Sequence, residues 1–158
     1  MASQSKKPAA PRKRSARSVA QVDVFLALIT TAERFERQVV ELLKGAGLSP
    51  SQYNILRILR GAGEAGLACG QVGGRLVRHD PDVTRLMDRL EKRGLIERAR
   101  ELQDRRVVRT RITPGGLELL ATLDAPVDDL HEQQLGHMSE RRLSELKTLL
   151  AEAGTRGD

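Results

Sequence analysis

The sequence predicts a mainly α-helical fold that carries one small β-hairpin. Of its 158 residues, 39% are hydrophobic but only 2% are aromatic, so the core must be built from Leu, Val, Ile and Ala, and Leu and Ala cost little on ordering in helices. Apolar residues recur at steps of three and four along most of the chain, the period of an amphipathic helix. One pair of short β-favouring runs flanks a polar loop near residues 95–112. The length predicts one domain with an appended oligomerisation arm.

Residues 1–18 form a basic arm. They contain six Lys and Arg residues and no acidic residue, and they have no apolar stripe that could pack against a core. We therefore expect this segment to be disordered. Its composition superficially resembles a transit peptide, but its two prolines and the missing amphipathic stripe argue against that interpretation.

Three helices are predicted in the first half of the chain. The apolar pattern from about residue 19 predicts a long helix that ends near residues 44–47, where two glycines suit a helix C-terminus. Ser49 and Pro50 fit the N-cap and the first position of a second helix. Residues 68–77 can form a short third helix, which depends on tertiary packing because it contains three glycines.

A fourth helix and the hairpin follow. Asp80 and Pro81 repeat the cap-and-proline device and predict a helix that runs to Arg93. Short extended segments near residues 95–96 and 107–112 flank a polar run and predict the β-hairpin. A hairpin of this size is not stable alone, so it must dock on the helices.

The C-terminal part is helical again. Thr113 and Pro114 start a fifth helix by the same device, and Pro126 should kink or break this helix near Ala125. Ser139 can cap a final helix whose leucines form one stripe. That stripe consists of Leu143, Leu146, Leu149 and Leu150.

The fourth predicted helix has a narrow apolar back and a polar outer face. At about 100° per residue, the apolar arc contains Val83, Leu86, Met87 and Leu90, and the opposite side contains Asp82, Thr84, Arg85, Asp88 and Arg89. Arg can donate two hydrogen bonds to guanine in the major groove, and Thr can contact a base edge or a thymine methyl group. We expect Asp88 to orient an arginine, because a carboxylate facing phosphates would be repelled.

An ordinary surface helix with ion pairs between neighbouring turns would present a similar face. The order along the chain decides against that interpretation. A short helix, a turn, a capped basic helix and a basic hairpin together indicate a winged helix-turn-helix, with the fourth helix as the recognition helix and the hairpin as the wing.

The predicted wing has Asp104, Arg105 and Arg106 at its tip. Asp104 has a simple explanation because turns favour Asp. Two adjacent arginines at an exposed tip can serve DNA binding, one in a narrow minor groove and one on a phosphate. Further arginines add charge along the hairpin stem, namely Arg98, Arg100, Arg109 and Arg111. His79 precedes the fourth helix, and we expect it either to contact a phosphate or to have no role in binding.

The net charge of +6 is unevenly distributed. Residues 1–18 account for all of it. Residues 75–111 hold twelve Lys and Arg against seven Asp and Glu, whereas residues 112–158 hold four against nine. A basic segment suits a phosphate-facing surface, and a local excess on one helix face and one hairpin tip is better evidence for DNA reading than the overall charge.

Four segments together resemble the MarR (multiple-antibiotic-resistance regulator) family of bacterial winged-helix proteins. They are residues 48–53 (LSPSQY), 82–96 (DVTRLMDRLEKRGLI), 104–106 (DRR) and 112–116 (ITPGG). The resemblance covers roughly residues 20–150. The combination at this spacing is specific, although no single segment is. The chain departs from the family pattern in its glycine-rich third helix and in Pro126, which interrupts a helix that is often continuous.

The resemblance implies a homodimer that grips a pseudo-palindromic operator in double-stranded DNA. By this analogy residues 19–47 are an N-terminal dimerisation helix, residues 48–113 the DNA-binding lobe and residues 114–158 the C-terminal dimerisation helices. Thr84, Arg85 and Arg89 would read the major groove. Arg106 would enter the minor groove, and Asp104 would help to hold the wing.

The family resemblance also implies a repressor that a small ligand, often an aromatic acid, or oxidation releases from DNA. An aromatic or phenolic effector would bind between the dimer helices and the DNA-binding lobe. Phe25, Phe35 and Tyr53 are candidate walls of that pocket, because they are the only aromatic residues. Core filling is the alternative role for each of them.

No catalytic arrangement and no cofactor is expected, so the protein is not predicted to be an enzyme. Cys69 is interpreted as a small core residue without a resolving cysteine. Acidic and histidine residues near the end of the fifth helix are too loosely spaced for a zinc site and indicate a solvated helix. This group contains Asp128, Asp129, His131, Glu132 and His137.

The single cysteine and the absence of an apolar span or secretory signal predict a cytoplasmic protein. The resemblance to bacterial DNA-binding proteins further implies a place at the bacterial nucleoid. Two other functions stay open from the sequence. One is a nonspecific architectural DNA binder driven by the basic arm, and the other is a winged-helix module for protein–protein docking.

Overall fold

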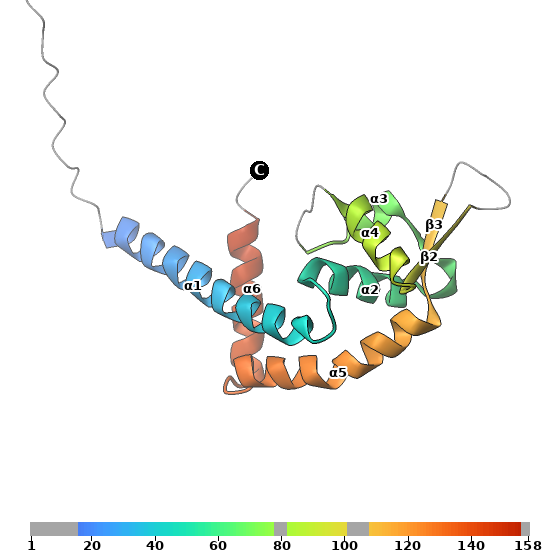
Figure 1. Ribbon diagram of the computed structural model, residues 1–158. Coiled ribbons are helices and arrows are strands. Elements are labelled where there is room, and N and C mark those ends of the chain that lie inside the picture. The colour runs from blue at the N-terminus through green and yellow to red at the C-terminus, as the bar shows by residue number, and fades with distance from the viewer. Residues whose placement is uncertain (1–15, 78–81, 101–107, 156–158) are drawn as a thin grey trace, which may run out of the picture. The chain divides into compact units, whose positions relative to one another are not determined.

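The computed structural model describes residues 16–77, 82–100 and 108–155. The chain divides into two compact units, residues 1–36 and 37–158. Within the described residues, helices α1 to α6 accompany a small three-stranded antiparallel sheet (Figure 1). This arrangement confirms the predicted fold class, which is mainly α with a small β-hairpin in a winged helix-turn-helix.

Helix α1 (Ala16–Lys44) begins in the first unit and ends in the second. Its end at Lys44 agrees with the predicted stop, and Leu43 near that end is fully buried. The part of α1 in the first unit presents exposed apolar side chains to solvent. These side chains belong to Val19, Val24, Phe25, Leu26, Leu28 and Ile29.

Helix α2 (Pro50–Ala62) begins as the sequence predicts. Ser49 is the N-cap, and its side chain accepts a hydrogen bond from the backbone N–H of Gln52. The Gln52 side chain accepts one from the backbone N–H of Ser49 in return, which completes a capping box. The inner face of α2 buries Ile55, Leu56 and Leu59 in the centre of the second unit.

The segment after α2 differs from the prediction. A 3₁₀ turn, η1 (Gly63–Ala65), leads into strand β1 (Leu67–Ala68), which was not predicted from the sequence. The third helix α3 (Cys69–Gly73) ends four residues earlier than predicted. Its glycines explain the early end, since glycine is about 1 kcal/mol less favourable than alanine in a helix. Packing of Val72 in the core anchors the short helix.

Helix α4 (Val83–Lys92) begins two residues after the predicted first residue, Pro81. The predicted cap, Asp80, and Pro81 itself lie outside the described residues. Asp82 occupies the N-cap position, but it makes no side-chain cap hydrogen bond. Its carboxylate lies 3.6 Å from the Arg85 guanidinium instead.

Strands β2 (Ile96–Arg100) and β3 (Val108–Ile112) form the predicted hairpin. They pair antiparallel with Ile96 opposite Ile112 and Arg100 opposite Val108. Strand β1 adds to the other side of β3, so the sheet order is β1-β3-β2 and β2 is an edge strand. The hairpin therefore has a third strand that the sequence did not reveal.

Helix α5 (Pro114–Leu135) starts at the predicted cap, because the Thr113 side chain accepts a hydrogen bond from the Gly116 backbone N–H. The helix continues through Pro126, so of the predicted kink or break near Ala125 the break does not occur. Figure 1 shows α5 changing direction along its length without ending. Helix α6 (Glu140–Gly154) follows, and none of its side chains is buried.

The core of the second unit lies around α2. It joins the end of α1, the helices α3 and α4, the start of the hairpin and the first half of α5. Tyr53 belongs to this core, and burial raises the pKa of its hydroxyl group. Gln134 of α5 is also buried, and its side-chain amide donates to the Gln38 side chain of α1 at 3.0 Å. This core holds α4 and the hairpin in fixed positions on one lobe.

Candidate nucleic-acid interface

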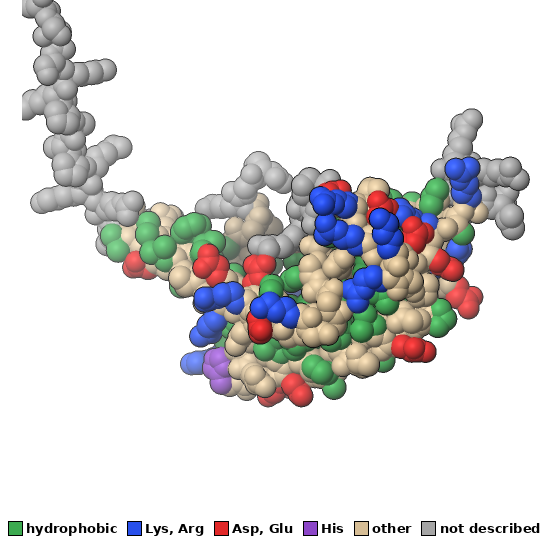
Figure 2. Space-filling model, in the orientation of Figure 1, with side chains coloured by type: hydrophobic (Ala, Val, Ile, Leu, Met, Phe, Trp, Pro, Cys, Tyr) green, Lys and Arg blue, Asp and Glu red, His purple; other side chains and the backbone are tan. Residues whose placement is uncertain are grey.

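Helix α4 presents the two faces that its sequence predicts. Met87 and Leu90 are fully buried, and Val83 and Leu86 pack at the margin of the core. Thr84, Arg85 and Arg89 are exposed on the outer side. Figure 2 shows Lys and Arg side chains gathered around α4, with acidic side chains among them. The helix therefore offers a hydroxyl and two guanidinium groups to solvent from a rigidly packed support.

Thr84 has a neighbour in α3. The Cys69 Sγ atom lies 3.7 Å from the Thr84 Oγ1 atom. Cys69 is partly buried and packs against the core, which agrees with its interpretation as a small core residue. This contact joins the two helices of the helix-turn-helix near the start of α4.

Arg85 is only loosely held. Its guanidinium lies 3.6 Å from the Asp82 carboxylate, and both side chains are more than half exposed. An exposed ion pair of this kind contributes little to stability. Asp82 therefore orients Arg85 at low cost, and the guanidinium can turn toward an anionic ligand.

Asp88 orients an arginine as expected, but the arginine is one that the helix does not carry. Its partner is Arg98 of strand β2, whose guanidinium also contacts Glu91. The Arg98 Nε atom donates to Glu91 Oε2 at 2.9 Å, and a terminal nitrogen donates to the same oxygen at 2.5 Å. The hydrogen bond from Arg98 lowers the pKa of Glu91, and the two carboxylates raise the pKa of Arg98.

This result corrects the view of Arg98 as added positive charge along the hairpin stem. Its side chain is only 23% exposed, and two carboxylates surround it. A role for Arg98 in the site was not predicted from the sequence. The sequence signal for this contact is weak, because two acidic residues one turn apart on a helix indicate that a basic partner exists but do not identify it.

Arg93 also serves the fold. Its guanidinium donates to the backbone carbonyls of Gly47 at 2.6 Å and Ala46 at 2.9 Å. These carbonyls belong to the turn between α1 and α2. Arg93 thus ties the end of α4 to that turn, and the contact fixes the tilt of the helix that carries Thr84 and Arg85.

Strand β3 carries Arg109 and Arg111 on one side by strand alternation. The Arg111 Nε atom donates to the backbone carbonyl of Glu64 in η1 at 2.5 Å. Arg111 thereby attaches the strand to the 3₁₀ turn. Its cross-strand neighbour on β2 is Glu97.

Four predicted DNA-binding residues lie outside the described residues. They are His79, Asp104, Arg105 and Arg106. The wing tip therefore stays a prediction. The strands that flank it are in place, so the chain does lead from α4 into a hairpin of the expected position.

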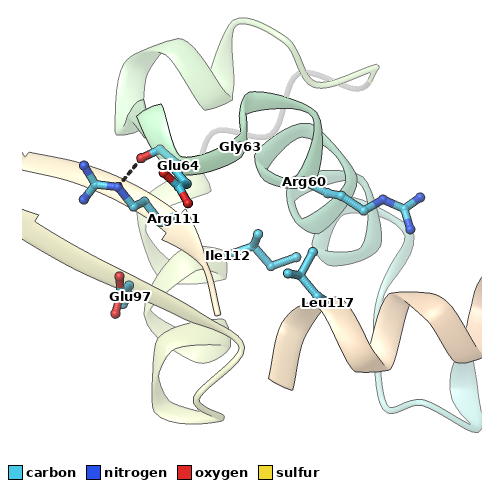
Figure 3. Close-up of a pocket in the computed structure, with 7 residues that line it drawn as sticks. All are labelled: Arg60, Gly63, Glu64, Glu97, Arg111, Ile112 and Leu117. Atoms are coloured by element: carbon cyan, nitrogen blue, oxygen red, sulfur yellow. Dashed lines mark hydrogen bonds between the residues drawn. The ribbon is translucent and has the colours of Figure 1, made fainter. Parts of the chain in front are cut away.

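A pocket of about 350 Å³ lies beside the base of the hairpin (Figure 3). Its lining residues come from α2, η1, the two hairpin strands and the start of α5. They are Arg60, Gly63, Glu64, Glu97, Arg111, Ile112 and Leu117. In Figure 3, Arg60 points away from the centre of the pocket, and its guanidinium donates to both carboxylate oxygens of Asp124 at 2.8 and 3.0 Å.

None of the three aromatic residues lines this pocket. Tyr53 is a core residue, which is the alternative role stated above. Phe25 is 60% exposed on α1, and the Arg34 guanidinium lies 5.2 Å from the centroid of the Phe35 ring. An effector pocket walled by these residues stays a prediction.

Across residues 16–77, 82–100 and 108–155, no three His, Cys, Asp or Glu side chains are grouped as metal ligands. His131 contacts Gln134 instead, with 3.2 Å between Nδ1 and Oε1. In the same part of the chain, no helix is both long enough and apolar enough to cross a membrane.

Comparisons with known proteins agree with this geometry. Residues 48–108, which span α2 to the start of β3, match the sequence model of the MarR family. The chain is 28% identical over 129 residues to the HTH-type transcriptional regulator FarR of Neisseria gonorrhoeae, a match that covers 82% of this chain and 87% of that protein.

Solved structures give the same result. The chain is similar to a crystal structure of a MarR transcription factor from Planctomyces limnophilus, with 38% identity, a TM-score of 0.66 and coverage of 89% of this chain and 98% of the other. It also shares the fold of a mutant MarR from E. coli complexed with operator DNA, with 22% identity, a TM-score of 0.74 and coverage of 85% and 95%.

Members of this family are transcription regulators and not enzymes, in agreement with the prediction from the sequence. The match to the family model falls on the helix-turn-helix and the hairpin, and the Planctomyces relative extends it over nearly the whole fold. The chain therefore belongs to the MarR family of winged helix-turn-helix transcriptional regulators.

Proposed function

We propose that this regulator binds a specific operator in double-stranded DNA through the outer face of α4. The observation that carries the proposal is the exposure of Thr84, Arg85 and Arg89 opposite an apolar side on which Met87 and Leu90 are fully buried. A rigid helix with these groups fits the major groove, where arginine discriminates guanine and threonine contacts thymine. The E. coli protein of the same fold is complexed with operator DNA, which supports operator DNA as the ligand of this chain.

The hairpin would act as the wing. Arg106 would enter the minor groove, Arg105 would contact a phosphate, and Asp104 would hold the tip. His79, just before α4, would approach the backbone. Phosphate contacts fix the register of the protein on DNA, and base contacts provide the sequence preference.

The functional unit would be a homodimer on a pseudo-palindromic site. Exposed apolar side chains on α1 and, separately, on α6 support this proposal, because a monomer gains nothing from exposing them. A two-fold dimer would place two copies of α4 in successive major grooves.

We further propose that operator binding represses transcription and that a small aromatic or phenolic ligand releases the DNA. Membership of the MarR family supports repression and its release by a ligand. A ligand between the dimer helices and the DNA-binding lobe, near Phe25, Phe35 or Tyr53, would alter the spacing of the two recognition helices.

The test is operator binding by single variants. The probe is a duplex that the wild-type chain selects from a randomised library. Arg85→Ala and Arg106→Ala should each weaken binding to it by about 1–3 kcal/mol. The matched control is Arg57→Ala, since Arg57 is an exposed arginine on α2, outside α4, the hairpin and the proposed dimer helices.

Unchanged binding by both variants would reject the proposal. Loss of all binding on removal of residues 1–18 would favour the architectural DNA binder. No salt-dependent DNA binding by the wild-type chain would favour the protein-docking module.

A further inference from the structure

Arg98 joins the two elements that are proposed to contact DNA. It lies in the middle of β2, and its guanidinium reaches Asp88 and Glu91 on successive turns of α4. The Asp88–Arg98–Glu91 cluster, called the clamp below, links charged side chains of α4 to the hairpin.

The clamp lies where it can prevent the hairpin from pivoting about its base. The base of the hairpin is already fixed, because the Leu95 N–H donates to the Leu90 carbonyl and the Thr113 N–H donates to the Leu95 carbonyl. Strand β1 secures β3 from the other side. The remaining edge is β2, and Arg98 holds this edge partway between the base and the wing tip.

The charge of the clamp does not favour DNA affinity. It contains two carboxylates and one guanidinium, so it places a net negative charge on a face that would approach phosphates. The Arg98 nitrogens already donate to carboxylates. A surface selected only for adhesion to DNA would omit the acids, because each phosphate contact depends on unneutralised positive charge.

We propose that Arg98 is a positioning residue that sets DNA sequence preference by holding the wing at a fixed angle to α4. The inference rests on the proposed function, in which α4 and the wing contact the same operator. Base contacts need side chains within fractions of an ångström of their partners. A pivoting wing would change the depth at which α4 lies in the groove and so disturb base contacts. Phosphate contacts carry no sequence information, so any change in them would affect all DNA sequences alike.

The critical variant is the double substitution Asp88→Asn/Glu91→Gln. It removes two negative charges, so simple electrostatics predicts tighter binding to every DNA. The clamp predicts the opposite for sequence preference. We expect the ratio of affinities for the library-selected duplex and a scrambled duplex of equal composition to fall about tenfold, the effect of one good base contact.

Two variants control for charge and for the arginine geometry. Glu97→Gln removes a negative charge from the opposite, exposed side of β2, so it should tighten binding to both duplexes equally and leave the ratio unchanged. Arg98→Met should lower the ratio as the double variant does. Arg98→Lys should restore part of it, since lysine keeps the charge but not the forked geometry.

Circular dichroism establishes whether each variant is folded. If Arg98→Met does not fold, Arg98→Lys keeps the test decisive. A double variant that binds both duplexes more tightly by the same factor would overturn the clamp and leave the proposed function intact. A wild-type chain that does not distinguish the two duplexes would overturn both.

Discussion

Arginine side chains on the DNA-binding lobe fall into two groups by what their guanidinium groups contact. Arg85 and Arg89 are exposed on the outer face of α4. Arg60, Arg93 and Arg98 donate to carboxylates or carbonyls within the chain. The first group can bind an external anion without breaking a strong internal contact, but the second group cannot. Contact partners, and not residue type, therefore separate the candidate DNA-reading residues from those that support them.

The Arg60–Asp124 pair predicts a pH dependence of stability. The hydrogen bond and charge of Arg60 lower the pKa of Asp124 in the folded chain. A carboxyl group with a lowered folded pKa stabilises the fold above its unfolded pKa of about 3.9, and the contribution is lost as the pH falls through the folded value. Asp124→Asn should therefore be less stable than wild type at pH 7. The difference in the free energy of unfolding should shrink below about pH 4.

Denaturant unfolding between pH 3 and pH 7 measures this difference. Asp129→Asn provides the control, because Asp129 is an exposed acid on the same helix. A stability gap for Asp124→Asn that stays constant down to pH 3 would show that the carboxylate charge does not contribute.

Two glycines, the first residue of η1 and the residue that follows η1, provide a matched pair. Gly63 and Gly66 have φ values of +58° and +60°, in a region that other residues rarely adopt. A Cβ atom at Gly63 would meet nothing within 4 Å, whereas one at Gly66 would lie 2.6 Å from the Thr110 carbonyl oxygen. Gly63→Ala should therefore lose about 1–3 kcal/mol through backbone strain alone. Gly66→Ala should lose about 1–3 kcal/mol more, because β3 must move.

Thermal and denaturant unfolding of the two alanine variants measure the loss from backbone strain and the additional loss from the clash with β3. Equal losses would mean that β3 yields to the extra methyl group without cost. The proposed wing would then be less rigidly attached to η1 than the Arg111 contact indicates.

At the scale of elements, local signals predicted most boundaries. Cap-and-proline pairs located the starts of α2 and α5, because capping depends on residues within one turn. Strand β1 was missed because two residues cannot show alternation, and its partner β3 is distant in sequence. The start of α4 was misplaced by two residues, since Asp82 occupies the N-cap position although its side chain makes no cap hydrogen bond. Helix α5 passes through Pro126 because packing of Leu123 and Val127 outweighs the local penalty.

The cap of α2 can be tested against a second serine. Ser49 makes a complete capping box, whereas Ser139 at the N-cap of α6 makes no side-chain cap hydrogen bond. Ser49→Ala should lower the free energy of unfolding by about 1 kcal/mol, and Ser139→Ala by clearly less. Urea unfolding of the two variants compares them directly. Equal effects would argue that the Gln52 contacts do not stabilise α2.

At the scale of the whole molecule, the candidate site was only partly predictable. The outer face of α4 followed from its 3.6-residue period, which is local. The clamp did not, because Arg98 lies in another element and the sequence leaves the choice among several stem arginines open. Predicting a long-range ion pair requires the strand register and the packing of the hairpin on α4. Both are tertiary properties that local sequence does not contain.

The unpaired apolar surface also belongs to this scale. Leu149 on α6 is 61% exposed and Phe25 on α1 is 60% exposed. An aspartate at either position would hardly affect a monomer, because neither side chain is in the core. In a homodimer interface it would bury an uncompensated charge, which is strongly unfavourable. If the chain forms the proposed homodimer, we therefore expect Leu149→Asp and Phe25→Asp each to convert it to a monomer in sedimentation experiments.

Loss of the dimer should also weaken operator binding by about 10²-fold or more, because the second half-site would no longer be held at high effective concentration. Val77→Asp is the control for surface charge. Val77 is 87% exposed and lies outside α1 and α6, so this variant should keep the dimeric mass. If the wild-type chain sediments as a monomer, or if both aspartate variants remain dimeric and bind the operator normally, these helices do not form the interface. Two α4 helices would then have to be brought to the operator by another surface.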